Sequence, residues 1–170
     1  MNFALKDWIN RKLITTFILT TVISSIMSFA YLRGWGELPI QGTFFLGWFA
    51  VYAMYVGVVI LLYGNIVSLL IEYFHIKRCF LPSWLYILLH GIFGLANGLI
   101  FHEVNAGVNV VLLFYSCMAA LFYGLIDRWI YIRTEAGKSL SLPIAVPMVV
   151  FVSCYLYFLL GHYYFLLYIR

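Results

Sequence analysis

The longest uncharged stretch of the chain, residues 38–71, reads LPIQGTFFLGWFAVYAMYVGVVILLYGNIVSLLI. About 20 apolar residues are enough for a helix to cross the hydrocarbon core of a bilayer. Strands of a membrane barrel instead alternate apolar and polar residues over about 10 positions, and this long apolar run has no such alternation. The stretch therefore predicts a transmembrane helix, which we place at residues 47–71.

Four further uncharged runs flank this stretch, and each is long enough to cross a bilayer. We place the other spans at residues 13–32, 84–101, 107–126 and 145–167. The whole chain is 65% apolar and 9% charged, against about 45–50% and about 25% in soluble domains. This composition excludes a soluble enzyme, a secreted disulfide scaffold and a nucleic-acid-binding domain. It predicts an all-α polytopic membrane protein, in which residues 1–170 form one bundle of five transmembrane helices.

The lysines and arginines divide unequally between the two sides that these spans define. One side carries eight of them: Lys6, Arg11, Lys12, Lys77, Arg78, Arg128, Arg133 and Lys138. The other side carries two, Arg33 and Arg170. Because cytoplasmic loops are enriched in lysine and arginine, the distribution predicts a cell-membrane protein with its N-terminus in the cytoplasm and its C-terminus outside.

The first apolar run has features of a secretory signal peptide, since cations precede it and a small-x-small pattern occupies residues 28–30. The run continues to Leu32, and we expect the first helix to be retained. The cysteines, at positions 79, 117 and 154, form no C-x-x-C pair. We expect them to be free thiols in a reducing compartment.

Small residues form rows along two of the predicted helices. Thr16, Thr20, Ser24 and Ser28 are spaced four apart, which places their hydroxyl groups on one face of the first helix. Packing within the molecule, a partner-binding face and a polar pore lining all fit this row. Gly94 and Gly98 form a G-x-x-x-G motif, which allows close approach of a second membrane helix.

Two acidic residues lie at matching cytoplasmic helix ends, Glu72 after the second span and Asp127 after the fourth. Carboxylates at a helix C-terminus oppose the helix dipole, so nearby cations would stabilise them. Lys77 and Arg78 are the expected partners of Glu72, and Arg128 or an arginine of another loop is the expected partner of Asp127. The alternative to such ion pairs is a paired acidic gate at a cytoplasmic mouth.

A polar network is predicted between the second and third spans. Asn65, Ser68 and Glu72 share one helix face, and His90 and Asn97 share a face of the third span. If the two faces meet, Asn65 or Glu72 can bond His90 or Asn97. The network then either joins helices through structural hydrogen bonds or handles protons at His90.

The sequence contains no nucleophile elbow, phosphate-binding loop or dinucleotide fingerprint. His102 and Glu103 are potential metal ligands, and His162 falls near the same membrane face. However, there is no H-E-x-x-H pattern, and no third ligand follows this pair at a metal-binding spacing. We therefore predict no enzyme activity, no metal and no cofactor. An intramembrane enzyme that pairs His90 or His102 with Glu72 or Glu103 is the weakest alternative.

Two helix ends resemble each other. Tyr63-Gly64 precedes a Leu-Ile-acid sequence that ends at Glu72, and Tyr123-Gly124 precedes a similar one that ends at Asp127. A parallel repeat of two helical hairpins would explain the similarity. With the sequence Ser68-Leu-Leu-Ile-Glu72, these motifs make the chain similar to short uncharacterised multi-pass membrane proteins of Gram-positive bacteria. That resemblance implies no particular activity.

Two functional hypotheses follow from these patterns. The first is an interaction protein, that is, a membrane subunit, regulator or immunity-type factor that binds another membrane protein. Besides the lipid bilayer, the expected partners of the chain are such a protein or further copies of the chain in a homo-oligomer. The second is an oligomeric channel or small transporter with a polar path near Asn65, Glu72, His90 and Asn97. A protein partner would support the first hypothesis, and a hydrated path lined by those residues would support the second.

Overall fold

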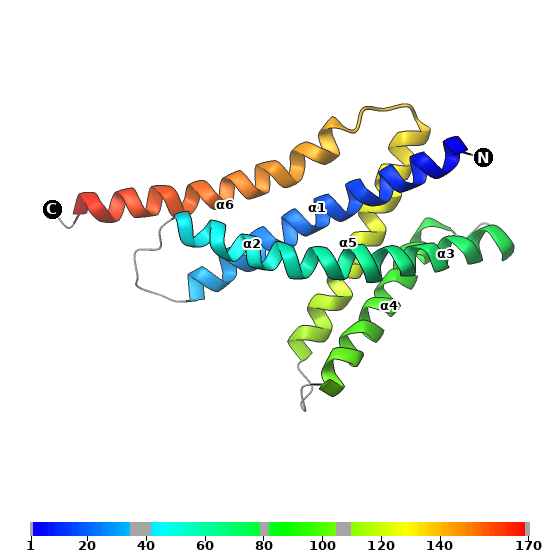
Figure 1. Cartoon of the computed structure of the whole chain (residues 1–170), viewed down its shortest axis with the longest axis horizontal. Coiled ribbons are helices and arrows are strands. Elements are labelled where there is room, and N and C mark those ends of the chain that lie inside the picture. Colours follow the sequence, from blue (N-terminus) through cyan, green and yellow to red (C-terminus); the bar gives the residue numbers. More distant parts are fainter. Residues whose placement is uncertain (1, 35–41, 79–81, 105–109, 169–170) are drawn as a thin grey trace. The chain divides into compact units, whose positions relative to one another are not determined.

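A computed structural model describes residues 2–34, 42–78, 82–104 and 110–168, with side chains described for residues 7–34, 43–73, 82–99 and 113–161. Within these ranges the regular structure is entirely helical, which confirms the all-α prediction. The helices are α1 (Asn2–Gly34), α2 (Gly42–Val59), α3 (Asn65–Arg78), α4 (Ser83–Val104), α5 (Val110–Glu135) and α6 (Ser141–Tyr168) (Figure 1). A π-helical turn, η1 (Ile60–Gly64), joins α2 to α3 without a break.

Three helical stretches in the described part of the chain are long and apolar enough to cross a membrane. They are Asp7–Gly34, Thr43–Tyr73 and Ser141–Gly161. The apolar stretch Ser83–Leu99 of α4 is shorter. Apolar residues cover much of the outer surface of these helices, and Met54 and Tyr55 on α2 are 61% and 66% exposed. A surface of this kind suits a lipid environment rather than water.

The helices continue beyond the predicted spans at their polar ends. α5 extends past residue 126 to Glu135, where Gly137 adopts a left-handed conformation with φ of 62°. The Lys138 amide donates to the Arg133 carbonyl (2.9 Å) and the Gly137 amide to the Thr134 carbonyl (3.1 Å). This glycine cap satisfies carbonyls at the end of α5. Hydropathy marks only the apolar part of a helix, so the helices are longer than the spans predicted within them.

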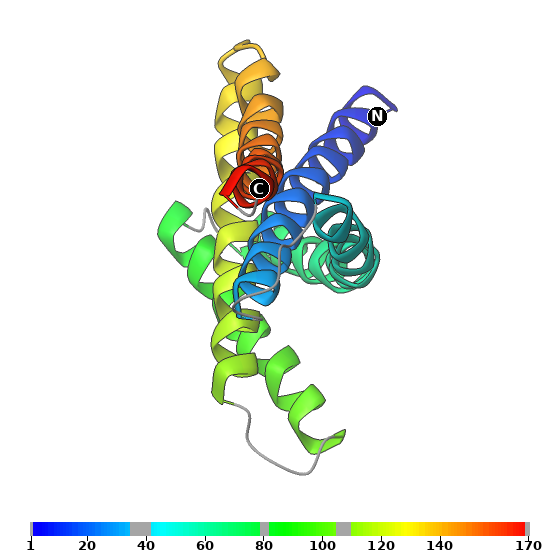
Figure 2. The ribbon, with the colours of Figure 1, turned by 90° about the vertical axis from the view of Figure 1, so that its left-hand side faces the viewer.

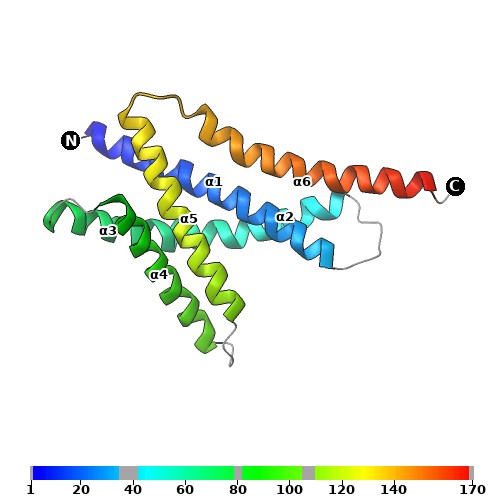
Figure 3. The same cartoon turned by 180° about the vertical axis from the view of Figure 1, so that it is seen from behind.

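The chain divides into two compact units. The first contains Met1–Thr16 and Ile60–Leu140, and the second contains Phe17–Val59 and Ser141–Arg170. In the first unit, α4 and α5 lie side by side (Figures 2 and 3). Val67 and Ile71 of α3 form a buried core with Tyr86 of α4. These contacts place the ends of α3, α4 and α5 close to one another.

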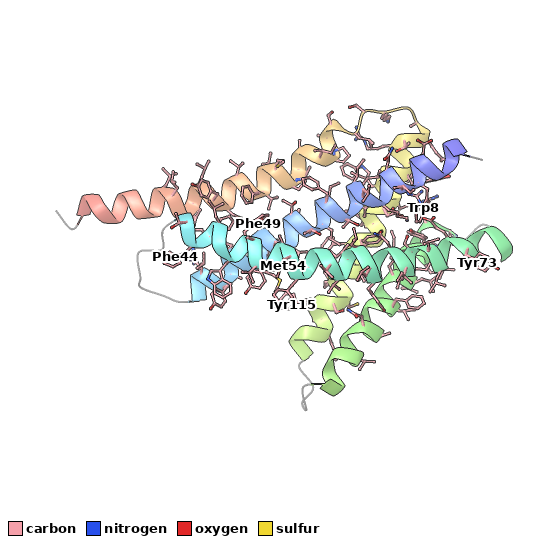
Figure 4. The ribbon with its side chains drawn as sticks, viewed as in Figure 1. Trp8, Phe44, Phe49, Met54, Tyr73 and Tyr115 are labelled. Atoms are coloured by element: carbon pink, nitrogen blue, oxygen red, sulfur yellow. The ribbon has the colours of Figure 1, made fainter. Side chains whose placement is uncertain are left out.

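Aromatic rings dominate the core of the second unit. Leu32 of α1, Phe45 of α2 and Phe158 of α6 are buried together. Phe49, labelled in Figure 4, packs edge-on against Phe151 with ring centroids 4.6 Å apart. Such pairs add about 0.5–1.5 kcal/mol to the free energy of burial. They join α2 to α6 and hold the end of α1 against both helices.

Candidate functional site: a buried charge cluster

The first unit contains a cluster of four charged side chains. Arg11 and Lys12 come from α1, Glu72 from α3 and Asp127 from α5. Burying charges is expensive unless each is paired and hydrogen-bonded. Two cations and two anions make the formal charge of this cluster zero, which meets that condition.

Lys12 lies at the centre of the cluster and is 2% exposed. Its ammonium group donates to Asp127 Oδ2 at 2.8 Å, to Glu72 Oε1 at 2.7 Å and to the Ser68 hydroxyl. A lysine ammonium has three donors and no acceptor, so these bonds use its full capacity. Lys12 therefore links α1 to both α3 and α5.

Asp127 is 1% exposed, yet its carboxylate is well supplied with partners. Besides Lys12, it faces Arg11 Nε at 3.3 Å and accepts a hydrogen bond from the Tyr86 hydroxyl at 2.6 Å. The Thr15 hydroxyl lies 3.4 Å from its Oδ1 atom. Because these groups stabilise the ionised form, the cluster holds a carboxylate rather than a neutral acid.

Glu72 forms the open edge of the cluster, since its side chain is 21% exposed. It pairs with Arg11 and accepts a hydrogen bond from Trp8 Nε1 at 2.5 Å. Trp8, on α1, is labelled in Figure 4. The cluster therefore meets the surroundings of the protein through Glu72 and Arg11, while Lys12 and Asp127 are enclosed.

Of the partners predicted for Asp127, an arginine from another part of the chain is present, namely Arg11, but Arg128 is not. Arg128 does not pair with Asp127 but donates from Nε to the Ser83 hydroxyl at 3.0 Å. The observed partners, Arg11 and Lys12, come from the N-terminal part of the chain rather than from the loop beside each acid. The side chains of Lys77 and Arg78 lie outside the described residues. A count of lysines and arginines places all of these cations on one side of the membrane. It does not show which of them contact the carboxylates.

Tyr131 packs between two arginines at the rim of the cluster. The guanidinium carbons of Arg11 and Arg128 lie 5.1 Å and 4.8 Å from its ring centroid. Its hydroxyl donates to Glu135, and this hydrogen bond, with some help from burial, raises the pKa of Tyr131. Cation–π contacts of this kind stabilise arginine side chains by about 0.5–1 kcal/mol at exposed sites.

The predicted network of Asn65, His90 and Asn97 does not form among the described residues. Asn65 instead accepts a hydrogen bond from the Tyr123 hydroxyl at 2.5 Å and donates to the Leu61 carbonyl in η1 at 2.9 Å. Asn97 donates to the Ser116 hydroxyl at 3.2 Å. The hydrogen-bond partners of these two amides differ from the predicted ones, because both amides bond residues of α5.

His90 is 2% exposed and lies between aromatic rings. Its ring centroid is 4.6 Å from that of Tyr86 and 5.5 Å from that of Tyr123. Nδ1 lies 2.9 Å from the Tyr86 carbonyl, which fixes the orientation of the imidazole. A Cβ atom at Gly124 would approach the His90 ring to 3.1 Å. A side chain at position 124 would therefore displace the imidazole ring by a few tenths of an ångström.

Gly94 and Gly98 lie where α4 and α5 approach closely. A Cβ atom at Gly94 would come within 2.5 Å of Ala120 Cβ and 2.7 Å of the Ser116 carbonyl oxygen. A Cβ atom at Gly98 would lie 2.8 Å from Leu113. Both glycines face residues of α5, so this G-x-x-x-G motif packs within the chain.

Three members of the predicted hydroxyl row on α1 are buried, and Thr20 is half-buried. Thr16 is 7% exposed, and both Ser24 and Ser28 are 0% exposed. A Cβ atom at Gly57 of α2 would lie 3.4 Å from the Thr20 methyl group, so Thr20 marks a close approach of α1 and α2 within the second unit.

Several residues around the cluster and around His90 were missed by the sequence-based prediction. Tyr86 lies four positions before His90, and Tyr123 lies four positions before Asp127. Residues four apart share a helix face, so this spacing was an available signal. Trp8, Arg11 and Lys12 carried no comparable signal, because their only evident role was to mark the cytoplasmic end of the first helix.

Among the side chains that the structure describes, no group of three His, Cys, Asp or Glu residues could hold a metal ion. His102, Glu103 and His162 lie outside these described side chains. Comparison with protein-family models, curated proteins and solved structures finds no match to the chain. The similarity to multi-pass proteins of Gram-positive bacteria therefore stays a prediction.

Proposed function

We propose that the chain is a small multi-pass protein of the cell membrane that works by binding another membrane protein, as a subunit, regulator or immunity-type factor. The pairing of the buried charges carries this proposal. Arg11, Lys12, Glu72 and Asp127 bind one another and join three helices. Ionisable residues within membrane helices usually mark a transport or catalytic site, but these four are engaged in holding the helices together.

The contacts of the polar residues weigh against the transport hypothesis in its original form. That hypothesis requires Asn65, His90 and Asn97 to line a common hydrated path. Asn65 and Asn97 each bond a different part of α5, and His90 packs between two tyrosine rings. A binding protein needs no such path, because its apolar helix faces supply the contact area.

Native mass spectrometry of the protein, extracted from its own membrane into polymer-bounded lipid discs, tests partner binding. We expect a complex heavier than the 19.7 kDa chain that contains a second, different membrane protein. Single chains with bound lipid alone would contradict the proposal. Masses at whole-number multiples of 19.7 kDa alone would favour the oligomeric channel or transporter instead.

The proposed topology has five spans, with the N-terminus in the cytoplasm and the C-terminus outside. α4 and α5 supply the two spans beyond the three long apolar helices. At about 1.5 Å per residue, α4 with 22 residues and α5 with 26 residues both exceed a hydrocarbon core of about 30 Å. Glycine-lined packing between them supports their insertion as one hairpin.

Reporter fusions test this topology. Alkaline phosphatase fused after Arg170 is expected to be active, because the enzyme matures only outside the cytoplasm. Green fluorescent protein fused after Lys138 is expected to fluoresce, because this point precedes α6 on the cytoplasmic side. If both fusion points report the same side, α6 does not cross the membrane and the five-span topology fails.

A further inference from the structure

The end of α5 and the turn that follows it carry more cations than acids. Residues 128–138 contain three cations and one acid, which are Arg128, Arg133, Lys138 and Glu135. Among the described side chains, none of these cations pairs with a carboxylate, because every ion pair there involves Arg11 or Lys12. The carboxylate of Glu135 accepts a hydrogen bond from the Tyr131 hydroxyl instead. This stretch therefore has an excess of positive charge, whereas the charge cluster beside it is neutral.

Arg128 connects α5 to the beginning of α4 and keeps unused donors. Its Nε donates to the Ser83 hydroxyl at 3.0 Å, and its guanidinium carbon lies 4.8 Å from the centre of the Tyr131 ring. These contacts fix the orientation of the guanidinium. In the described part of the chain, no hydrogen bond uses its terminal nitrogens, Nη1 and Nη2. Because the planar fork of an arginine matches the oxygens of a phosphate, Arg128 is a fixed donor with capacity for an anion.

Exposed apolar side chains continue from this end along the α4–α5 hairpin. Trp84, the second residue of α4, is 65% exposed. Leu88 and Ile92 follow it at intervals of four residues, so the three side chains form one exposed stripe along α4. On α5, Leu125 is exposed and lies three positions before Arg128. Tryptophan is enriched at membrane interfaces, so this arrangement is typical of a helix end where hydrocarbon meets headgroups.

A phospholipid uses both the positive charge and the apolar stripe. Clusters of lysine and arginine at the ends of membrane helices bind anionic headgroups. From Arg128 to Arg133 the helix rises about 7.5 Å, close to the headgroup layer of about 5–8 Å on each side of a bilayer. A free phosphate would bind the guanidinium but make no use of the stripe. A zwitterionic headgroup would gain little from the excess positive charge.

We propose that this end of the α4–α5 hairpin binds an anionic phospholipid. Its phosphate oxygens accept hydrogen bonds from the Nη groups of Arg128, and an acyl chain lies along the stripe that begins at Trp84. Arg133 and Lys138 favour a headgroup with net negative charge. The site rests on the proposed insertion of α4 and α5 as a membrane hairpin, and it does not depend on the binding of a partner protein.

Native mass spectrometry of the full chain in a mild detergent tests the site. The detergent contains equal amounts of phosphatidylglycerol, which is anionic, and phosphatidylcholine, which is zwitterionic, with identical acyl chains. We expect the chain to retain phosphatidylglycerol in preference. Arg128→Gln should lower this preference about fivefold, the effect of one cation near an anionic surface. Equal retention of the two lipids by the unaltered chain would overturn the proposal.

Two control variants separate a local site from other causes. Arg33→Gln removes the same charge from an exposed arginine near the end of α1 and should leave the preference unchanged. If it acts as strongly as Arg128→Gln, net charge alone attracts the lipid and the site fails. Ser83→Ala removes the hydrogen bond between α5 and α4 but keeps the guanidinium. It should retain at least half of the preference, and complete loss would make helix packing the cause and overturn the site.

Soluble competitors distinguish the lipid from other anions. Neither inorganic phosphate nor a tetra-aspartate peptide, each added in excess, is expected to displace the phosphatidylglycerol. Displacement by phosphate would indicate a simple anion site, and displacement by the peptide would indicate an acidic protein segment as the occupant. Either result would overturn the proposal.

Insertion of the hairpin is measured separately with alkaline phosphatase fused after Ala106, between α4 and α5. An active fusion is expected, because a hairpin that crosses the membrane twice places this point outside the cytoplasm. An active fusion without a preference for phosphatidylglycerol overturns the lipid site alone. An inactive fusion overturns the hairpin and the lipid site together.

Discussion

Asp127→Asn is expected to lower the free energy of unfolding by about 3–5 kcal/mol, the range found when one member of a buried ion pair is removed. The amide keeps the size of the carboxylate but loses its charge. Lys12 would then remain 2% exposed with Glu72 as its only anion, and Arg11 would lose its second partner. The loss would be measured by titrating the protein with a denaturing detergent and following tryptophan fluorescence.

Glu135→Gln is the matched control on the same helix. Glu135 is exposed and contacts Tyr131 rather than the cluster. Its substitution is expected to change the free energy of unfolding by no more than about 0.5 kcal/mol. A similar loss in both variants would show that removing any acid of α5 destabilises the protein, and the specific role of Asp127 would fail.

A double variant measures the coupling between Lys12 and Asp127 apart from their other contacts. Lys12→Met combined with Asp127→Leu removes one cation and one anion and leaves Arg11 paired with Glu72. Apolar replacement of a complete buried pair is often neutral or stabilising. We therefore expect the double variant to lose less stability than the sum of the two single variants. Additive losses would contradict direct coupling between Lys12 and Asp127.

Gly94→Ala is expected to destabilise the protein by about 1–3 kcal/mol, as is typical of overpacking. The new Cβ atom would lie 2.7 Å from the Ser116 carbonyl oxygen and 3.1 Å from Cys117 Cα. Backbone atoms of α5 cannot rotate away, so α4 and α5 must separate. This penalty outweighs the gain of up to about 1 kcal/mol that alanine brings to a helix interior. The same detergent titration measures the change.

Two other glycines provide a graded control. Gly91→Ala would meet the Leu121 methyl group at 2.6 Å, but that methyl ends a flexible side chain and can move, so the loss should be smaller. Gly47→Ala meets nothing within 4 Å and should leave stability unchanged or raise it. If all three variants behave alike, close packing of α4 on α5 is not what requires Gly94.

The helices of this protein could be predicted from its sequence because uncharged runs are long and charged residues few. Glu72 and Asp127 could also be selected, since acids at matching helix ends are rare in such a chain. In the structure both bind Lys12, which comes from a different helix. The choice between cations of the same membrane side depends on tertiary packing, which a count of charges does not contain.

The orientation of α4 also could not be predicted from the sequence. His90 and Asn97 share one helix face, but a face alone does not identify the helix that it meets. Gly94 and its neighbours bring α4 so close to α5 that Asn97 bonds Ser116 rather than a residue of α2 or α3.

The π-helical turn could not be predicted from the sequence either, because Ile60–Gly64 differs from its surroundings in hydrogen bonding and not in hydropathy.

The ion pair between Lys12 and Asp127 also has a consequence for synthesis on the ribosome, because 115 positions separate the two residues. At about 5–20 residues per second, the lysine precedes its aspartate by about 6–23 s. In the proposed topology, the first helix therefore enters the membrane with cations whose carboxylates do not yet exist. We expect Lys12 to stay at the lipid headgroups or in the insertion machinery until α5 has been made, and to move into the protein interior only then.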